Sequence, residues 1–170
     1  MGRVQSTRIV VVMGVSGAGK STVGRALARE LGWTFLDADD VHPAANVERM
    51  ARGEPLSERD REPWLTRLAE RIREHLERDE PLVLACSALK EAHRERLAVA
   101  PRAVCFVHLD ASPDVLRRRL ESRRGHWFGA ELLASQLEAL EPPGDALWLD
   151  AAEPVDALVR RIRAGLRLGP

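Results

Sequence analysis

The stretch IVVVMGVSGAGKSTVG, residues 9–24, decides the fold of this chain. Its first five residues are apolar and mostly β-branched, which predicts a strand buried on both faces. Residues 14–21 then match the pattern G-x-x-x-x-G-K-[ST] in full, and an amphipathic helical pattern runs from Lys20 to Leu31. A strand, a glycine-rich loop and a helix in this order form a phosphate-binding loop, in which backbone N–H groups and the helix N-terminus face phosphate oxygens.

Two side chains of this loop are expected to do chemistry. Lys20 is a mobile cation for the β- and γ-phosphates of ATP, and Ser21 supplies a hydroxyl for Mg²⁺. We therefore predict that the chain binds Mg-ATP. The expected ATP contacts within the loop are Gly14, Val15, Ser16, Gly17, Ala18, Gly19, Lys20, Ser21 and Thr22.

Strands and helices alternate along the rest of the chain. Apolar runs predict further strands at 33–36, 82–86, 103–109 and 147–149. Helical patterns lie between them, at about 43–52, 60–76, 88–99, 112–122, 131–140 and 155–166. The alternation predicts an α/β fold with three layers, in which helices cover both faces of a parallel five-stranded sheet. Functional residues should then lie at the carboxyl ends of the strands.

The start of one helix can be argued from its proline. Pro63 is tolerated only in the first turn of a helix, so Asp60 is expected to be the N-cap rather than Ser57. Another helix should begin at Ser112, with Pro113 in its first position.

Composition limits the class of protein. A length of 170 residues with 45% apolar and 31% charged residues fits one domain over 1–170. The 26 basic and 26 acidic residues balance, which argues against binding to nucleic acid or a membrane surface. No apolar run approaches the ~18 residues of a membrane span, so we expect a cytoplasmic protein. Cys86 and Cys105 lie in apolar runs and should be free, buried thiols.

An acidic loop follows the second predicted strand. Asp37 could hold Mg²⁺ through water, and Asp39 could accept the proton of an attacking hydroxyl, although either carboxylate could be the base. A solvated acidic turn is the alternative. No N-K-x-D motif of GTPases is present, and Cys86-Ser87 occupies the place of a Walker B aspartate. These features favour a small kinase whose acceptor binds beside the phosphate loop.

From Met13 to about Pro143 the chain resembles the gluconate kinases of the small P-loop type. The P-loop itself is generic, but three further motifs in this order are specific to that family. They are DADDVHPAANVERM at 37–50, DREPWL at 60–65 and CSALK at 86–90. Later segments, RRGHWF at 123–128 and LLASQLEALEPP at 132–143, match as well. One of the only two lysines, Lys90, lies in CSALK, and the other is Lys20.

The resemblance implies a fold like that of nucleoside monophosphate kinases and shikimate kinase, with a small lid at about 123–130. It implies transfer of the ATP γ-phosphoryl group to the 6-hydroxyl of D-gluconate, which supplies sugar-acid catabolism and the pentose phosphate pathway. Arg119 and Arg123 match lid arginines that contact ATP, and Arg123 joins Lys20 and Asp39 as a catalytic residue. The implied substrate-binding residues are Asp39, His42, Asn46, Arg61, Ser87, Lys90, Arg94 and His126. The expected partners are ATP and gluconate, with Mg²⁺ on Ser21 and Asp37, and a homodimer is left open.

Some positions depart from the family pattern or have a simpler explanation. Ala38 stands where the family commonly has glycine, and His93 where we expect an aromatic residue such as tyrosine. Arg61 could simply pair with a helix carboxylate, and Ser87 could simply cap the helix after it. Shikimate kinase is the competing enzyme, and a nucleotide-binding regulatory module is the competing non-enzyme.

Overall fold

A computed structural model describes residues 6–123 and 130–169. Its strands are β1 (Ile9–Met13), β2 (Thr34–Asp37), β3 (Leu82–Ala85), β4 (Val104–Asp110) and β5 (Ala146–Asp150). They form one sheet in the order β2-β3-β1-β4-β5, and every neighbouring pair is parallel. The predicted parallel five-stranded sheet is therefore confirmed.

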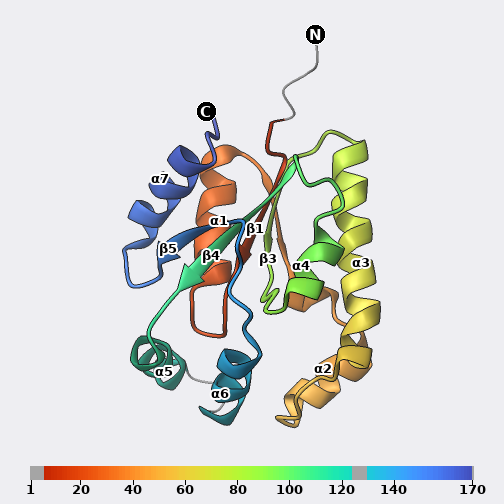
Figure 1. Cartoon of the computed structure of the whole chain (residues 1–170), viewed down its shortest axis with the longest axis vertical. Helices are drawn as coiled ribbons and strands as arrows, with labels where there is room; N and C mark the ends of the chain where they lie inside the picture. The colour runs from red at the N-terminus through yellow and green to blue at the C-terminus, as the bar shows by residue number, and fades with distance from the viewer. Residues whose placement is uncertain (1–5, 124–129, 170) are drawn as a thin grey trace.

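Helices cover both faces of the sheet (Figure 1). On one side lie α1 (Lys20–Leu31) and α7 (Val155–Gly165), and on the other lie α3 (Glu58–Glu77) and α4 (Glu91–Leu97). All five residues of β1 are 0% exposed, because alternate side chains enter two different cores. The continuous apolar run of β1 thus reflects its central position in a three-layer fold. Within the described residues, no helix has the length and apolar character needed to cross a membrane.

Four further helices lie at the carboxyl ends of the strands. They are the 3₁₀ helix η1 (Ala38–Val41), α2 (Ala44–Ala51), α5 (Pro113–Ser122) and α6 (Ala130–Ala139). Figure 1 shows α2, α5 and α6 at the lower end of the molecule, opposite both chain termini. Since parallel strands all end at this edge, the loops that follow β1, β2 and β3 meet there.

The two cysteines are free thiols, as predicted. Cys86 is buried, and its burial raises the pKa of the thiol to about 12. Cys105 is only half-buried, with its Sγ 3.3 Å from Thr7 Oγ1. Cys86 therefore stays protonated at neutral pH and offers no thiolate.

Several helix boundaries follow the local signals, whereas two predicted helix starts do not. Gly32 ends α1 in the left-handed region at φ 67°, and the hydroxyl of Ser112 caps α5. The helix predicted from Ala88, however, begins only at Glu91. Ala88 has φ 44°, a left-handed value that a right-handed helix cannot contain, and Lys90 is extended. The segment between β3 and α4 is consequently a loop, which is free to line a cavity.

The predicted N-cap of α3 is wrong, because Ser57 caps this helix and Pro63 is its sixth residue. Ser57 Oγ accepts from the Asp60 N–H at 3.1 Å, and the Asp60 carboxylate accepts from the Ser57 N–H at 3.0 Å. This reciprocal capping box satisfies two backbone donors that would otherwise lack partners. Because Pro63 has no N–H, the carbonyl of Arg59 lacks its usual helix donor. The capping box nevertheless stabilises the first turn of α3.

Replacing Ser57 by alanine should lower the free energy of unfolding by about 1 kcal/mol, because the Asp60 N–H loses its acceptor. Urea denaturation followed by circular dichroism measures the change. A variant as stable as the wild type would show that the helix start does not depend on this cap.

Candidate active site

The loop between β1 and α1 has a backbone that only glycine accommodates easily. Gly17 and Gly19 have φ 85° and 94°, in the left-handed region. A Cβ on Gly14 would lie 2.9 Å from the carbonyl oxygen of Leu109, so the loop passes close to the end of β4. Gly19 is the N-cap of α1, and the helix N-terminus therefore faces the loop. This is the arrangement that binds phosphate.

Lys20 occupies the first position of α1 and reaches back across the loop. Its Nζ donates to the Val15 carbonyl at 3.0 Å. Burial lowers the pKa of Lys20, whereas the nearby carboxylates of Asp39 and Asp37 act in the opposite direction. A bound phosphate would favour the charged ammonium in the same way as these carboxylates do.

Ser21 and Asp37 bring two oxygen ligands together beside Lys20. Ser21 Oγ donates to Asp37 Oδ2 at 2.5 Å. The other oxygen of Asp37 accepts from the Asp39 N–H at 3.0 Å, so η1 begins on this carboxylate. A hydroxyl and a carboxylate suit Mg²⁺, which takes its remaining ligands from phosphates and water. The residues present therefore fit Mg²⁺.

A cavity of 330 Å³ opens in front of this loop. Its lining comes from the loop, from the acidic turn after β2 and from the end of α5. The lining residues are Ser16, Gly17, Gly19, Lys20, Ser21, Thr22, Arg25, Asp37, Asp39, Leu120 and Arg123. Predicted phosphate and metal residues thus converge on one space with Arg123, one of the two predicted lid arginines.

Arg119 contacts the phosphate loop and lines a second cavity. Its guanidinium donates to the carbonyls of Gly17 and Ala18, each at 3.2 Å, and to that of Ala151 at 2.5 Å. These bonds use carbonyl acceptors of the loop and none of its N–H donors. An adjoining cavity of 160 Å³ is lined by Arg119, Arg123 and the segment after β5 that includes Val155.

A further cavity of 160 Å³ lies on the other side of the loop. Ser16, Lys20 and Asp39 line both this cavity and the 330 Å³ cavity, so the two spaces meet at these three residues. The remaining lining residues come from the end of η1, α2, the connection between α2 and α3, α3 itself, the loop after β3 and α6: His42, Met50, Glu54, Pro55, Leu56, Arg61, Trp64, Ser87, Leu89, Lys90, Leu132, Ser135, Gln136 and Ala139.

Five of the predicted substrate residues therefore line one cavity: Asp39, His42, Arg61, Ser87 and Lys90. Asn46 does not line it. Asn46 is 4% exposed, and its Nδ2 donates to the Asp60 carbonyl at 2.8 Å, which ties α2 to α3. His126 lies outside the described residues, as does most of the predicted lid.

The structure also keeps Arg94 away from this cavity, contrary to the role expected for it. Its guanidinium donates to the carbonyls of Ala88, Leu89 and Glu141 at 2.9–3.0 Å. These bonds hold the loop after β3 in place and occupy the donors that a substrate would need. Arg94 lies four residues after Lys90, so the sequence suggested that it also faces the substrate. In the structure its side chain instead binds the backbone carbonyls of neighbouring segments.

His42 is held by an aromatic neighbour. Its ring stacks on Trp64 with centroids 4.3 Å apart, and Trp64 Nε1 donates to the Ala38 carbonyl at 2.7 Å. Burial lowers the pKa of His42 to about 4, and the charge of Arg61 adds to this effect. His42 is consequently a neutral hydrogen-bonding group at physiological pH.

Two residues that the sequence analysis did not select also shape this site. Gln136 on α6 accepts from the Ser16 N–H at 2.7 Å and so joins α6 to the phosphate loop. Glu58 on α3 binds Arg61 and Lys90 at 2.9 and 3.1 Å. The spacing of Glu58 and Arg61, three residues apart, predicts their ion pair, but the contact with Lys90 has no sequence signal.

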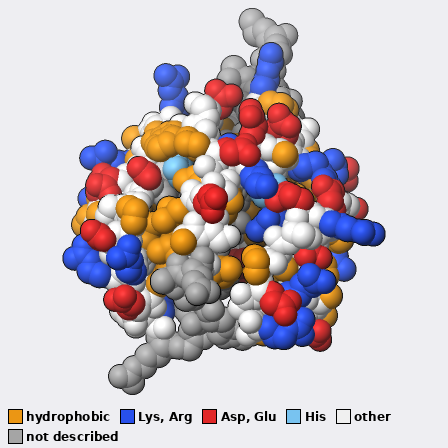
Figure 2. Space-filling model, turned by 60° about the horizontal axis from the view of Figure 1, so that its bottom comes forward, with side chains coloured by type: hydrophobic (Ala, Val, Ile, Leu, Met, Phe, Trp, Pro, Cys, Tyr) orange, Lys and Arg blue, Asp and Glu red, His pale blue; other side chains and the backbone are white. Residues whose placement is uncertain are grey.

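Figure 2 shows the end of the molecule where these loops meet. On this face, the basic and acidic side chains of the described residues are interspersed rather than gathered into a field of one sign. Such a surface suits a small charged ligand in a pocket better than a polyanion laid across it.

Comparison with known proteins agrees with this geometry. The AAA domain family matches residues 9–143. A gluconokinase of Gluconobacter oxydans (strain 621H) is 49% identical over 138 residues, which cover 81% of this chain and 78% of the relative. The thermoresistant gluconokinase of Escherichia coli (strain K12) is 39% identical over 155 residues, with 89% of each chain covered. The solved structure of a gluconokinase from Sinorhizobium meliloti 1021 has a TM-score of 0.84 at 42% identity and covers 98% of this chain and 94% of that one.

Stability should depend on pH through His42. In the unfolded chain this imidazole binds a proton near its ordinary pKa of 6.5, whereas in the folded protein it does so only near pH 4. Between these values the unfolded state binds more protons, so the free energy of unfolding should fall as the pH falls from 6.5 to 4. Urea denaturation at several pH values should show a shallower fall for His42→Phe, which keeps a stacking ring and removes the titration. Parallel curves for the two proteins would contradict this assignment.

Proposed function

Because the chain belongs to the gluconokinase family of small P-loop kinases, we propose that it transfers the γ-phosphoryl group of ATP to the 6-hydroxyl of D-gluconate. The product, 6-phospho-D-gluconate, enters sugar-acid catabolism and the pentose phosphate pathway. The observation that carries the proposal is the junction of two cavities at Ser16, Lys20 and Asp39. A phosphoryl donor in one cavity and an acceptor in the other would meet at that junction, which is the requirement for direct transfer.

The nucleotide occupies the phosphate loop side. Its phosphates fit the 330 Å³ cavity, and its base fits the adjoining space beside Arg119. Ser21 and Asp37 would hold Mg²⁺ between them, and the metal would neutralise charge on the β- and γ-phosphates. Arg123 lines both nucleotide cavities and is suited to stabilise charge on the transferring group.

Transfer joins the acceptor oxygen to the γ-phosphorus and breaks the bond from that phosphorus to the β–γ bridging oxygen. The hydroxyl proton goes to a carboxylate, for which we propose Asp39 because it lines both cavities. Asp37 lines only the nucleotide cavity and is hydrogen-bonded to Ser21, which suits the metal side. The ammonium group of Lys20 would stabilise the negative charge that develops on the bridging oxygen.

The acceptor cavity suits a small polyol that carries a carboxylate. Lys90 and Arg61 supply two cations for that carboxylate, while His42 and Ser87 supply hydrogen-bonding groups for hydroxyls. We leave Asn46 and Arg94 out of this set, since their polar groups bind the backbone.

We propose one kinase domain over residues 1–170, with a lid at about 123–130 that includes His126. The cytoplasmic location and a homodimer remain predictions.

The direct test is an ATP-dependent screen over gluconate, its epimers and shikimate, with each product identified by mass. We expect phosphorylation of gluconate in clear preference to shikimate. Preference for shikimate, or ATP hydrolysis that no sugar acid stimulates, would overturn the proposal.

Lys20→Ala should lower kcat on the order of 10²-fold or more while leaving the fold intact. The variant loses a few kcal/mol of stabilisation of the charge that develops during transfer. Steady-state kinetics measure the loss, and a thermal melt checks the fold. Activity within a few-fold of the wild type would refute this role.

Asp39→Asn should lower kcat strongly and change ATP binding little, because the amide keeps the shape of the side chain and loses its basicity. Turnover and nucleotide affinity should be measured separately. If kcat is preserved and only Mg-ATP affinity falls, Asp39 belongs to the metal side and Asp37 becomes the base.

A further inference from the structure

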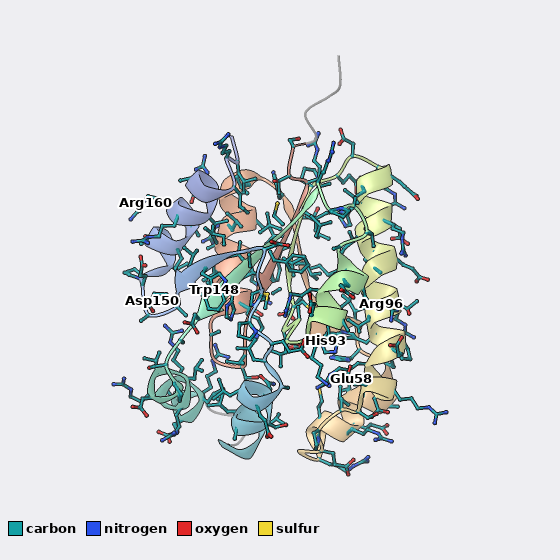
Figure 3. All side chains as sticks on the ribbon, viewed as in Figure 1. Glu58, His93, Arg96, Trp148, Asp150 and Arg160 are labelled. Carbon is teal, nitrogen blue, oxygen red and sulfur yellow. The ribbon has the colours of Figure 1, made fainter. Side chains whose placement is uncertain are left out.

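One carboxylate, that of Glu58, binds two cations that line the acceptor cavity, Arg61 and Lys90. Glu58 Oε1 accepts from Arg61 at 2.9 Å and from Lys90 Nζ at 3.1 Å. Its Oε2 lies 2.8 Å from His93 Nε2. Figure 3 shows Glu58 and His93 in the region where α3 faces α4. Glu58 therefore joins the two helices at the edge of the acceptor site.

His93 completes a closed ring of contacts around Lys90. Its Nδ1 is 3.4 Å from the backbone N–H of Lys90 and must accept that hydrogen bond. A neutral imidazole that accepts at Nδ1 carries its proton on Nε2, and this proton is then donated to Glu58. Lys90 is consequently held at both ends, with its backbone bound to His93 and its ammonium group to Glu58. The His93 side chain is only 5% exposed, whereas the Glu58 side chain is 50% exposed, so the buried imidazole anchors the inner side of this arrangement.

These contacts are of the kind that pre-organises a binding site. A lysine loses much rotamer freedom when it binds a ligand, and fixing it beforehand removes part of that cost. Without Glu58, the like charges of Lys90 and Arg61 would repel each other and separate. Partial burial alone would raise the pKa of Glu58, but the hydrogen bonds from His93 and Lys90 lower it to about 2. The group is therefore a carboxylate wherever the enzyme is folded and active.

A second ion pair between the same helices provides a matched comparison. Glu62, one turn after Glu58, binds Arg96 at 2.6 Å. Neither of these residues lines the acceptor cavity. Any loss that comes merely from weakening the contact between α3 and α4 should therefore appear in both pairs.

We propose that Glu58 and His93 are positioning residues, which hold the ammonium group of Lys90 and the guanidinium of Arg61 together for the carboxylate of the acceptor. The inference rests on the proposed function, because it assumes that the acceptor is a sugar acid. It also gives a role to His93, where the family pattern led us to expect an aromatic residue. A tyrosine could donate through its hydroxyl, but it has no ring nitrogen that could accept from the Lys90 N–H.

The test is a double-mutant cycle measured with gluconate and ATP. Glu58→Gln should raise the gluconate KM about tenfold, with a smaller change in kcat and an unchanged KM for ATP. Lys90→Met should lower kcat/KM for gluconate by roughly ten- to hundred-fold. Adding Glu58→Gln to Lys90→Met should then cost no more than about threefold, because the carboxylate no longer has this cation to position. The control Glu62→Gln should stay within about twofold of the wild type.

Two His93 variants test whether His93 helps to position Lys90. His93→Phe keeps the ring and removes both hydrogen bonds, so it should raise the gluconate KM as Glu58→Gln does. His93→Gln can place its amide nitrogen near Glu58 and should restore part of the loss. Thermal melts of all variants separate poor folding from poor positioning.

Independent losses for Glu58→Gln and Lys90→Met, multiplying in the double variant, would overturn the inference. So would an equal rise in KM for the Glu62→Gln control. Nitrogen-15 NMR of the histidine rings adds a readout that needs no acceptor, because it should show His93 protonated at Nε2 and not at Nδ1. The opposite tautomer would overturn the inference, whereas a wild type that ignores gluconate but shows this tautomer would overturn the proposed function only.

Discussion

The close approach of the phosphate loop to the ends of its neighbouring strands is the constraint on which the rest of this structure depends. The Gly14 N–H donates to the Ser87 carbonyl at 3.4 Å, just beyond β3, and its Cα leaves no room for a side chain against Leu109 at β4. The loop is thereby fixed to the ends of both strands that flank β1. This contact places the nucleotide cavity and the acceptor cavity on two sides of one short segment.

Cations and amides from distant helices hold the loop in this position. Arg119 on α5 binds the carbonyl oxygens of Gly17 and Ala18, and Gln136 on α6 accepts from the Ser16 N–H. Each contact joins segments more than 100 residues apart in the chain. The phosphate loop is consequently held by both α5 and α6, and α6 also lines the acceptor cavity.

The acceptor side relies on charges that are paired before any substrate arrives. Lys90 and Arg61 are 33% and 24% exposed, yet both bind one carboxylate. Isolated surface ion pairs contribute little to stability, but a network that fixes two cations relative to each other can contribute to specificity. The zero net charge of the chain therefore does not describe the site, where charge is organised over a few ångströms.

The sequence by itself determined the fold class, the nucleotide loop and the family motifs. β1 and α1 have the predicted boundaries, because a β-branched strand, a glycine loop and a glycine-terminated helix are local features whose physics needs no distant partner. Only the tertiary structure decided which cations face the acceptor. Lys90 and Arg94 are only four residues apart in the sequence, but backbone carbonyls bind Arg94 while Lys90 reaches the cavity. The contacts of Glu58 were likewise settled by packing between α3 and α4, since hydrogen bonds between residues 35 positions apart give no periodic pattern in the sequence. The start of α3, by contrast, is set by the local capping box of Ser57 and Asp60.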